Sequence, residues 1–117
     1  MDAAAVVTTY VQAWHERDTA ARRRLLERSW ADDGVYTDPN TTIEGRDALV
    51  DAIADFHEQR PDVRIEVRSR IDGFGSHFRF VWATVDGAGT VRDGIDVGRL
   101  DRDGRIESII GFFGVVP

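Results

Sequence analysis

The C-terminal third of the chain decides the fold: His77-Phe-Arg-Phe-Val-Trp-Ala-Thr-Val85, then Thr90-Val-Arg-Asp-Gly-Ile-Asp-Val-Gly-Arg-Leu100, then Arg105-Ile-Glu-Ser-Ile-Ile-Gly-Phe-Phe113. Each segment is rich in the β-branched and aromatic residues that favour strands. Asp86-Gly-Ala-Gly89 separates the first two segments, and Asp103-Gly104 separates the last two. Short glycine turns of this kind join antiparallel neighbours, so the sequence predicts a run of hairpin-connected strands.

One more strand is expected between the helical first half of the chain and this C-terminal stretch. Apolar residues at 63, 65, 67 and 71 alternate with charged ones, the pattern of a half-buried strand over residues 63–71. Asp72-Gly-Phe-Gly75 is expected to turn the chain into the strand that starts at His77.

The first half of the chain has helical periodicity. Apolar residues three or four positions apart predict helices over residues 3–17, 19–30 and 46–59, with Asp18 capping the second. The arginine run at 22–24 is interpreted as a solvated face of that second helix, with Arg23 pairing with Glu27 four residues on. Three helices followed by antiparallel strands predict an α+β fold.

Between the second and third helices we expect one short strand. Ala31-Asp-Asp-Gly34 is a turn signal, and Val35 to Asp38 is expected to be a strand that ends at Pro39. Residues 39–45 are expected to be a loop with a small strand around Ile43.

Composition limits the functions that this chain can have. Its 117 residues suit one domain over 1–117, and the absence of cysteine excludes disulfides, thiolate metal sites and a cysteine nucleophile. A net charge of −6 argues against a nucleic-acid partner. No apolar run reaches the length of a membrane span and the N-terminus lacks a signal-peptide pattern, so we expect a cytoplasmic protein without a membrane partner.

Asp96 is the most unusual of the candidate functional residues. It alternates with Gly94 and Gly98 on one face of its strand, while Val91, Ile95 and Val97 occupy the other. Aspartate is disfavoured inside strands, and strand glycines often mark the close approach of a ligand. If the Val and Ile side chains form the core, however, Asp96 is simply exposed. The alternation of side chains along the strand does not decide which of its two faces is buried, so both possibilities stay open.

Two further residues are candidates with ordinary alternatives. Asp38 comes directly before Pro39, and an Asp-Pro pair is also a common turn element. Tyr10 shares the apolar face of the first helix with Val7 and Trp14, so it is also a plausible core aromatic.

Several short motifs, taken in order, resemble the SnoaL-like branch of the NTF2-like superfamily. They are Tyr10-Val-Gln-Ala-Trp-His-Glu-Arg-Asp18, Ala31-Asp-Asp-Gly-Val-Tyr-Thr-Asp-Pro39, Gly45-Arg-Asp-Ala-Leu49 and Leu100-Asp-Arg-Asp-Gly-Arg-Ile106. The resemblance implies a cone-shaped barrel in which three N-terminal helices pack on a strongly curved, mostly antiparallel sheet. It also implies a homodimer and a pocket for a small apolar ligand.

Within that superfamily the mechanistic parallel is ketosteroid isomerase. Tyr10 lies in a Tyr-Val-x-Ala motif similar to that of the isomerase tyrosine, Asp38-Pro39 matches its base, and Ile95-Asp96 matches its second oxyanion donor. The residues Asn40-Thr-Thr42 after the proline are polar here, which departs from the steroid enzyme. The resemblance therefore implies acid–base catalysis without a cofactor, of isomerase or polyketide-cyclase type.

Under that interpretation Asp38 is the base, and Tyr10 and a protonated Asp96 stabilise the enolate. The pocket would be lined by Trp14, Phe56, Gly94 and Gly98. The alternatives are a protein that binds an apolar ligand without chemistry and a dimerisation module.

His15, His57 and His77 lack metal-ligand spacing, so no metal is expected. An epoxide hydrolase is rejected because Arg79-Phe80-Val81 lacks the Arg-x-Asp of that branch.

Overall fold

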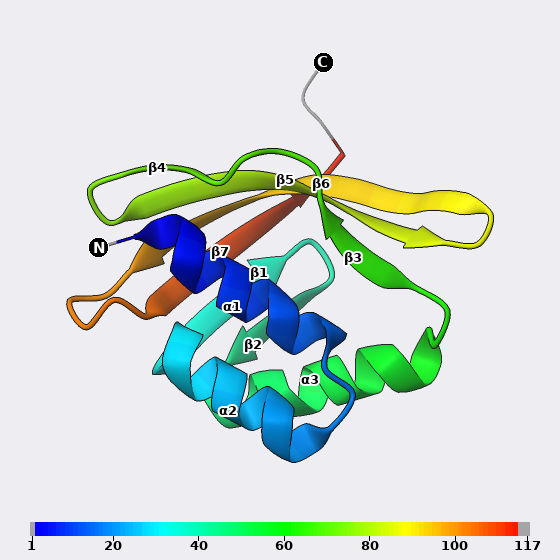
Figure 1. The fold of residues 1–117 in the computed structure, drawn as a ribbon, viewed down its shortest axis with the longest axis horizontal. Helices are drawn as coiled ribbons and strands as arrows, with labels where there is room; N and C mark the ends of the chain where they lie inside the picture. The colour runs from blue at the N-terminus through cyan, green and yellow to red at the C-terminus, as the bar shows by residue number, and fades with distance from the viewer. Residues whose placement is uncertain (1, 115–117) are drawn as a thin grey trace.

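The computed structural model describes residues 2–114 and contains three helices that cover one face of a curved sheet (Figure 1). The helices are α1 (Ala3–His15), α2 (Thr19–Ser29) and α3 (Arg46–Gln59). The strands are β1 (Trp30–Asp38), β2 (Thr41–Glu44), β3 (Arg64–Val67), β4 (Asp72–Phe74), β5 (His77–Asp86), β6 (Gly89–Leu100) and β7 (Ile106–Phe113). The predicted α+β fold is confirmed, with α3 inserted between two of the strands.

The sheet is mostly antiparallel and open. Its strand order is β2-β1-β7-β6-β5-β3, and β4 pairs with β5 beside this path. The β5-β6-β7 meander predicted from its turns forms its centre, whereas β1 pairs with β7 in parallel. Because the order ends at β2 and β3, the sheet curves without closing. The expected packing of three helices on a strongly curved, mostly antiparallel sheet is confirmed.

Local signals set most helix boundaries. Asp18 caps α2 as predicted, since its carboxylate accepts a hydrogen bond of 2.9 Å from the Ala21 backbone N–H. Asp2 caps α1 in the same way, with a 3.0 Å bond from the Ala4 N–H. The second helix ends one residue earlier than predicted, because Trp30 is the first residue of β1.

The prediction of a turn at residues 31–34 is wrong. β1 is continuous from Trp30 to Asp38, with an irregular register against β7 between Trp30 and Val35. A Cβ on Gly34 would lie 2.5 Å from the Trp30 indole nitrogen. The missing side chain at this position therefore makes room for the buried tryptophan, and the polar residues around it bulge outward.

A second expected turn is also partly a strand. Asp72–Phe74 forms β4, which pairs with β5, and the chain turns only at Gly75 and Ser76. The positive φ of 57° at Gly75 is the backbone conformation that glycine adopts readily and other residues rarely do.

Arg22 is buried, which contradicts its assignment to a solvated face. Its side chain is only 1% exposed, and its guanidinium donates to the backbone oxygens of Glu16 and Arg17, at 2.8 Å and 3.3 Å from Nη2. It therefore ties α2 to the end of α1. Arg23 forms its ion pair with Asp47 of α3, not with Glu27.

The core lies between the helices and the inner face of the sheet. Val7 of α1, Leu49 and Ile53 of α3, and Ile106 and Ile109 of β7 are fully buried there. The outer face is bare and exposes apolar side chains from β6 and β7. Within residues 2–114, no helix is both long and apolar enough to cross a membrane.

Candidate functional site

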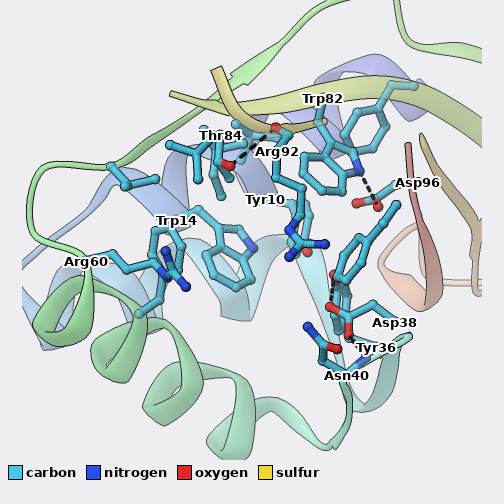
Figure 2. A pocket seen from close by; sticks show the side chains of 17 residues that line it. Tyr10, Trp14, Tyr36, Asp38, Asn40, Arg60, Trp82, Thr84, Arg92 and Asp96 are labelled. Carbon is cyan, nitrogen blue, oxygen red and sulfur yellow. Dashed lines mark hydrogen bonds between the residues drawn. The ribbon is translucent and has the colours of Figure 1, made fainter. Parts of the chain in front are cut away.

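A cavity of about 310 Å³ lies between α1, the end of α3 and the inner face of the sheet (Figure 2). One part of its lining is apolar: Val11, Trp14, Phe56, Val63, Ile65, Phe80, Val91 and Phe113. The other part has side chains that carry charge or hydrogen-bonding groups: Tyr10, Tyr36, Asp38, Asn40, Arg60, Trp82, Thr84, Arg92 and Asp96. The curvature of the sheet thus leaves a hollow under α1.

Asp96 lies on the inner face of β6, which resolves the parity question. Its side chain is 6% exposed, whereas Val97 on the opposite face is 41% exposed. The Trp82 indole Nε1–H donates a 2.8 Å hydrogen bond to Asp96 Oδ1. Burial raises the pKa of Asp96 from 3.8 to about 7, and the indole N–H only partly offsets this. Near neutral pH this carboxyl can therefore hold a proton and act as a donor.

Asp38 forms the turn expected of an Asp-Pro pair, and its side chain also lines the cavity. Its Oδ1 accepts hydrogen bonds from the backbone N–H groups of Asn40 (2.8 Å) and Thr41 (3.0 Å), the geometry of an Asx turn. Its Oδ2 accepts a 2.9 Å hydrogen bond from the Tyr36 hydroxyl. These three bonds hold the carboxyl group in one orientation.

The two aspartates meet at Gly111. This residue of β7 is opposite Asp96 in the β6–β7 register. A Cβ on Gly111 would lie 2.9 Å from Asp96 Oδ1, 3.1 Å from the Tyr36 hydroxyl and 3.5 Å from Asp38 Cβ. The polar groups of β1 and β6 therefore converge within a few ångströms of one point, and they can do so because residue 111 has no side chain.

Tyr10 faces the same cluster from α1 (Figure 2). Its ring stacks on Trp30 with centroids 5.3 Å apart, so it is a core aromatic as well as a pocket residue. Burial raises its pKa well above the ordinary 10.0, and the nearby charge of Asp96 adds to this. The hydroxyl consequently keeps its proton at physiological pH.

Of the four residues expected to line the pocket, two do so. Trp14 and Phe56 line the cavity and contact each other edge to face, with centroids 5.5 Å apart. Gly94 and Gly98 are not part of its lining, which corrects the expectation. The ring of Trp82 covers Gly94 and the ring of Phe78 covers Gly98, so the space above each glycine is filled by the neighbouring strand.

Sequence reasoning missed Tyr36 and both arginines of the lining. Tyr36 lies two residues before Asp38, so the alternation of β1 places both on one face. Arg92 shares the parity of Asp96 in the same way. Arg60 follows α3 directly, and no local signal pointed to it.

The histidines do not assemble a metal site. Among the residues that the structure describes, no three His, Cys, Asp or Glu side chains are grouped so as to hold a metal ion. The ring of His15 forms a 2.6 Å hydrogen bond with the backbone oxygen of Ile65, and burial lowers the pKa of His57. His77 does not line the cavity.

Comparisons with known proteins identify the family of this chain. The family model described as the SnoaL-like domain matches residues 7–109. A solved structure from Agrobacterium tumefaciens, described as a "putative isomerase of the SnoaL-like family", is 32% identical, with a TM-score of 0.87 over 95% of this chain and 96% of that one. No curated protein matches this chain.

Two more distant structures share the fold alone. One from Sinorhizobium meliloti, described as a "putative polyketide cyclase", is 18% identical, with a TM-score of 0.72 over 91% of this chain and 92% of that one. An NTF2-like protein of unknown function from Mesorhizobium loti is 20% identical, with a TM-score of 0.73 over 96% of this chain and 90% of that one.

Proposed function

The chain belongs to the SnoaL-like family, and on that premise we propose that it catalyses cofactor-independent proton transfer beside the carbonyl group of a small apolar compound, as an isomerase or cyclase. The observation that carries this proposal is the convergence of Asp38, Tyr36 and Asp96 at Gly111, inside a largely apolar cavity. At about 310 Å³, the cavity is near the lower end of the roughly 300–1,000 Å³ range of ligand pockets, which favours a small substrate.

In the proposed reaction Asp38 removes a proton from the carbon next to the carbonyl group, leaving an enolate. Tyr10 and protonated Asp96 donate hydrogen bonds to the enolate oxygen. Trp82 occupies Oδ1 of Asp96, so the proton to be donated belongs on Oδ2. In an isomerisation, Asp38 returns its proton to a different carbon. In a cyclisation, the enolate carbon attacks a second carbonyl carbon of the same molecule, and the alkoxide formed as that C=O π bond breaks takes the proton that Asp38 holds.

Tyr36 has a positioning role in this scheme. Its hydroxyl donates to Asp38 Oδ2, and burial raises its pKa well above the ordinary 10.0, so it remains a neutral donor. The hydrogen bond orients the carboxylate that acts as the base.

A second candidate is a binding protein that performs no chemistry. The observation that favours it is that both oxygens of Asp38 already accept hydrogen bonds. In this alternative the cluster holds the oxygen of a ligand while the apolar wall encloses the rest of it.

The test is the isomerisation of 3-cyclohexenone and its alkyl-substituted analogues to conjugated enones, followed by absorbance and by deuterium uptake in D₂O. We expect acceleration by the wild-type protein and a loss of roughly 100-fold or more in Asp38→Asn. Asp33→Asn is the matched control, because Asp33 lies on the same strand but is exposed and outside the cavity. Full turnover by Asp38→Asn would remove the base assignment. Binding of these enones without deuterium uptake would favour the second candidate.

A further inference from the structure

We propose that the substrate carries an anionic group, a carboxylate being the simplest, which Arg92 and Arg60 of the cavity wall bind. This inference rests on the proposed function, because it assigns the other end of the same substrate. The substrate class is then a small oxo acid with an apolar middle.

Among the described residues, the two arginines differ from most others because their guanidinium groups form no ion pair or hydrogen bond. Within residues 2–114, neither guanidinium has a carboxylate within 4.0 Å or a hydrogen-bond acceptor within 3.5 Å. By contrast, seven arginines form ion pairs with carboxylates: Arg23, Arg46, Arg64, Arg68, Arg70, Arg79 and Arg99. An acidic chain therefore leaves two cations unpaired in the wall of its cavity.

Arg92 is held in place by its contact with Phe113. It lies on the same face of β6 as Asp96, four residues before it. Its guanidinium carbon lies 4.0 Å from the centre of the Phe113 ring, and that ring contacts Trp82 edge to face. Stacking uses the flat face of the guanidinium and leaves its N–H edge free for a ligand.

Arg60 approaches from a different element. It is the C-cap residue of α3, where its backbone N–H bonds to the Phe56 oxygen and its side chain is free to turn toward the cavity. Figure 2 shows Arg60 beside Trp14 and Arg92 extending from β6, so the two cations come from two separate walls of the cavity. Each guanidinium can donate charge-assisted hydrogen bonds to a carboxylate.

Charge fixes the orientation of the ligand. Arg60 and Arg92 are the cationic side chains among the described residues that line the cavity, so an anionic group of a ligand is attracted to them. The carbonyl group must then lie at the Tyr10–Asp96 end. The apolar middle of the ligand contacts Trp14, Phe56 and Phe80 between the two ends.

The test is equilibrium binding of two matched probes, 3-(4-hydroxyphenyl)propanoate and its methyl ester, measured by isothermal titration calorimetry. The phenol stands in for the enolate, and only the acid carries the charge. We expect wild-type protein to prefer the acid by about tenfold or more at low salt, with a smaller preference at high salt. Arg92→Gln and Arg60→Gln should each reduce the preference, and the double variant should abolish it.

Matched controls separate charge recognition from folding. Arg24→Gln removes an exposed, unpaired arginine outside this cavity and should keep the full preference. Arg92→Lys keeps the charge and should retain part of it. Equal binding of acid and ester by the wild type, or an undiminished preference in the double variant, overturns the inference but leaves proton transfer from enones untouched. Binding of neither probe also overturns it. A clear acid preference without any enone turnover counts against the proposed function alone.

Discussion

Replacing Asp96 by asparagine should change how the stability of the protein depends on pH. In the folded protein burial raises the pKa of Asp96 from 3.8 to about 7, whereas in the unfolded chain the group regains its ordinary value. Between these values the folded state binds a proton that the unfolded state does not. Folding is therefore favoured at the acidic end, and stability falls as pH rises from about 4 to 7. Three pKa units correspond to about 4 kcal/mol.

The assay is urea or thermal unfolding of wild-type and Asp96→Asn protein from pH 4 to 8. We expect the wild type to lose about 4 kcal/mol relative to the variant across this range, on the order of 10 °C in Tm for a chain of this size. Above pH 7 the variant should be the more stable protein. Taking the difference between the two proteins removes the contribution of the other carboxylates.

Two further variants test whether this pH dependence comes from Asp96. Asp93→Asn makes the same change at an exposed position on β6 and should leave the curve parallel to that of the wild type. Trp82→Phe removes the N–H that lowers the pKa of Asp96, so its titration should move to higher pH. If the wild-type and Asp96→Asn curves stay parallel from pH 4 to 8, Asp96 is ionised throughout, and its role as a proton donor is refuted.

Gly111→Ala should reduce enone turnover by at least about tenfold, because the new Cβ would lie 2.9 Å from Asp96 Oδ1 and must displace that carboxyl. Gly87→Ala, with nothing within 4 Å of its Cβ, is the control, and equal turnover by both variants would show that the cluster is not the site of the chemistry. Homodimerisation, expected from the family resemblance, should use the outer face of the sheet, where the Ile95–Phe112 and Val97–Ile110 pairs form an apolar patch. Light scattering should find a dimer that Phe112→Arg dissociates and that Ala88→Arg, in the β5–β6 turn, leaves intact; a wild-type monomer would contradict this.

Elements whose signals are local could be predicted closely. The helix over residues 46–59 and the cap at Asp18 depend on apolar spacing and on a side chain next to the backbone that it satisfies. The β5 and β6 strands follow from β-branched runs between glycine turns. In each case the information lies within a few residues of the element itself.

Elements whose signals conflict with long-range pairing were predicted wrongly. The polar residues Asp32-Asp33-Gly34 look like a turn, but Trp30 pairs with Ile106 of β7 and draws the whole segment into the sheet. Arg22 looks like a surface charge, but the backbone oxygens at the end of α1 satisfy its guanidinium in the interior. Ile106 is far from Trp30 in sequence, and Glu16, although only six residues before Arg22, lies at the end of another helix.

The sequence by itself determined which side chains share a face, and so it singled out Asp38, Asp96 and Tyr10 as candidates. Only the tertiary structure decided which face of β6 the helices cover, that Tyr36 and Gly111 complete the cluster, and that two unpaired arginines lie in the cavity wall. Strand alternation depends on the geometry of the backbone alone. Burial depends on which distant element packs against each face, and that is settled by the free energy of the whole chain.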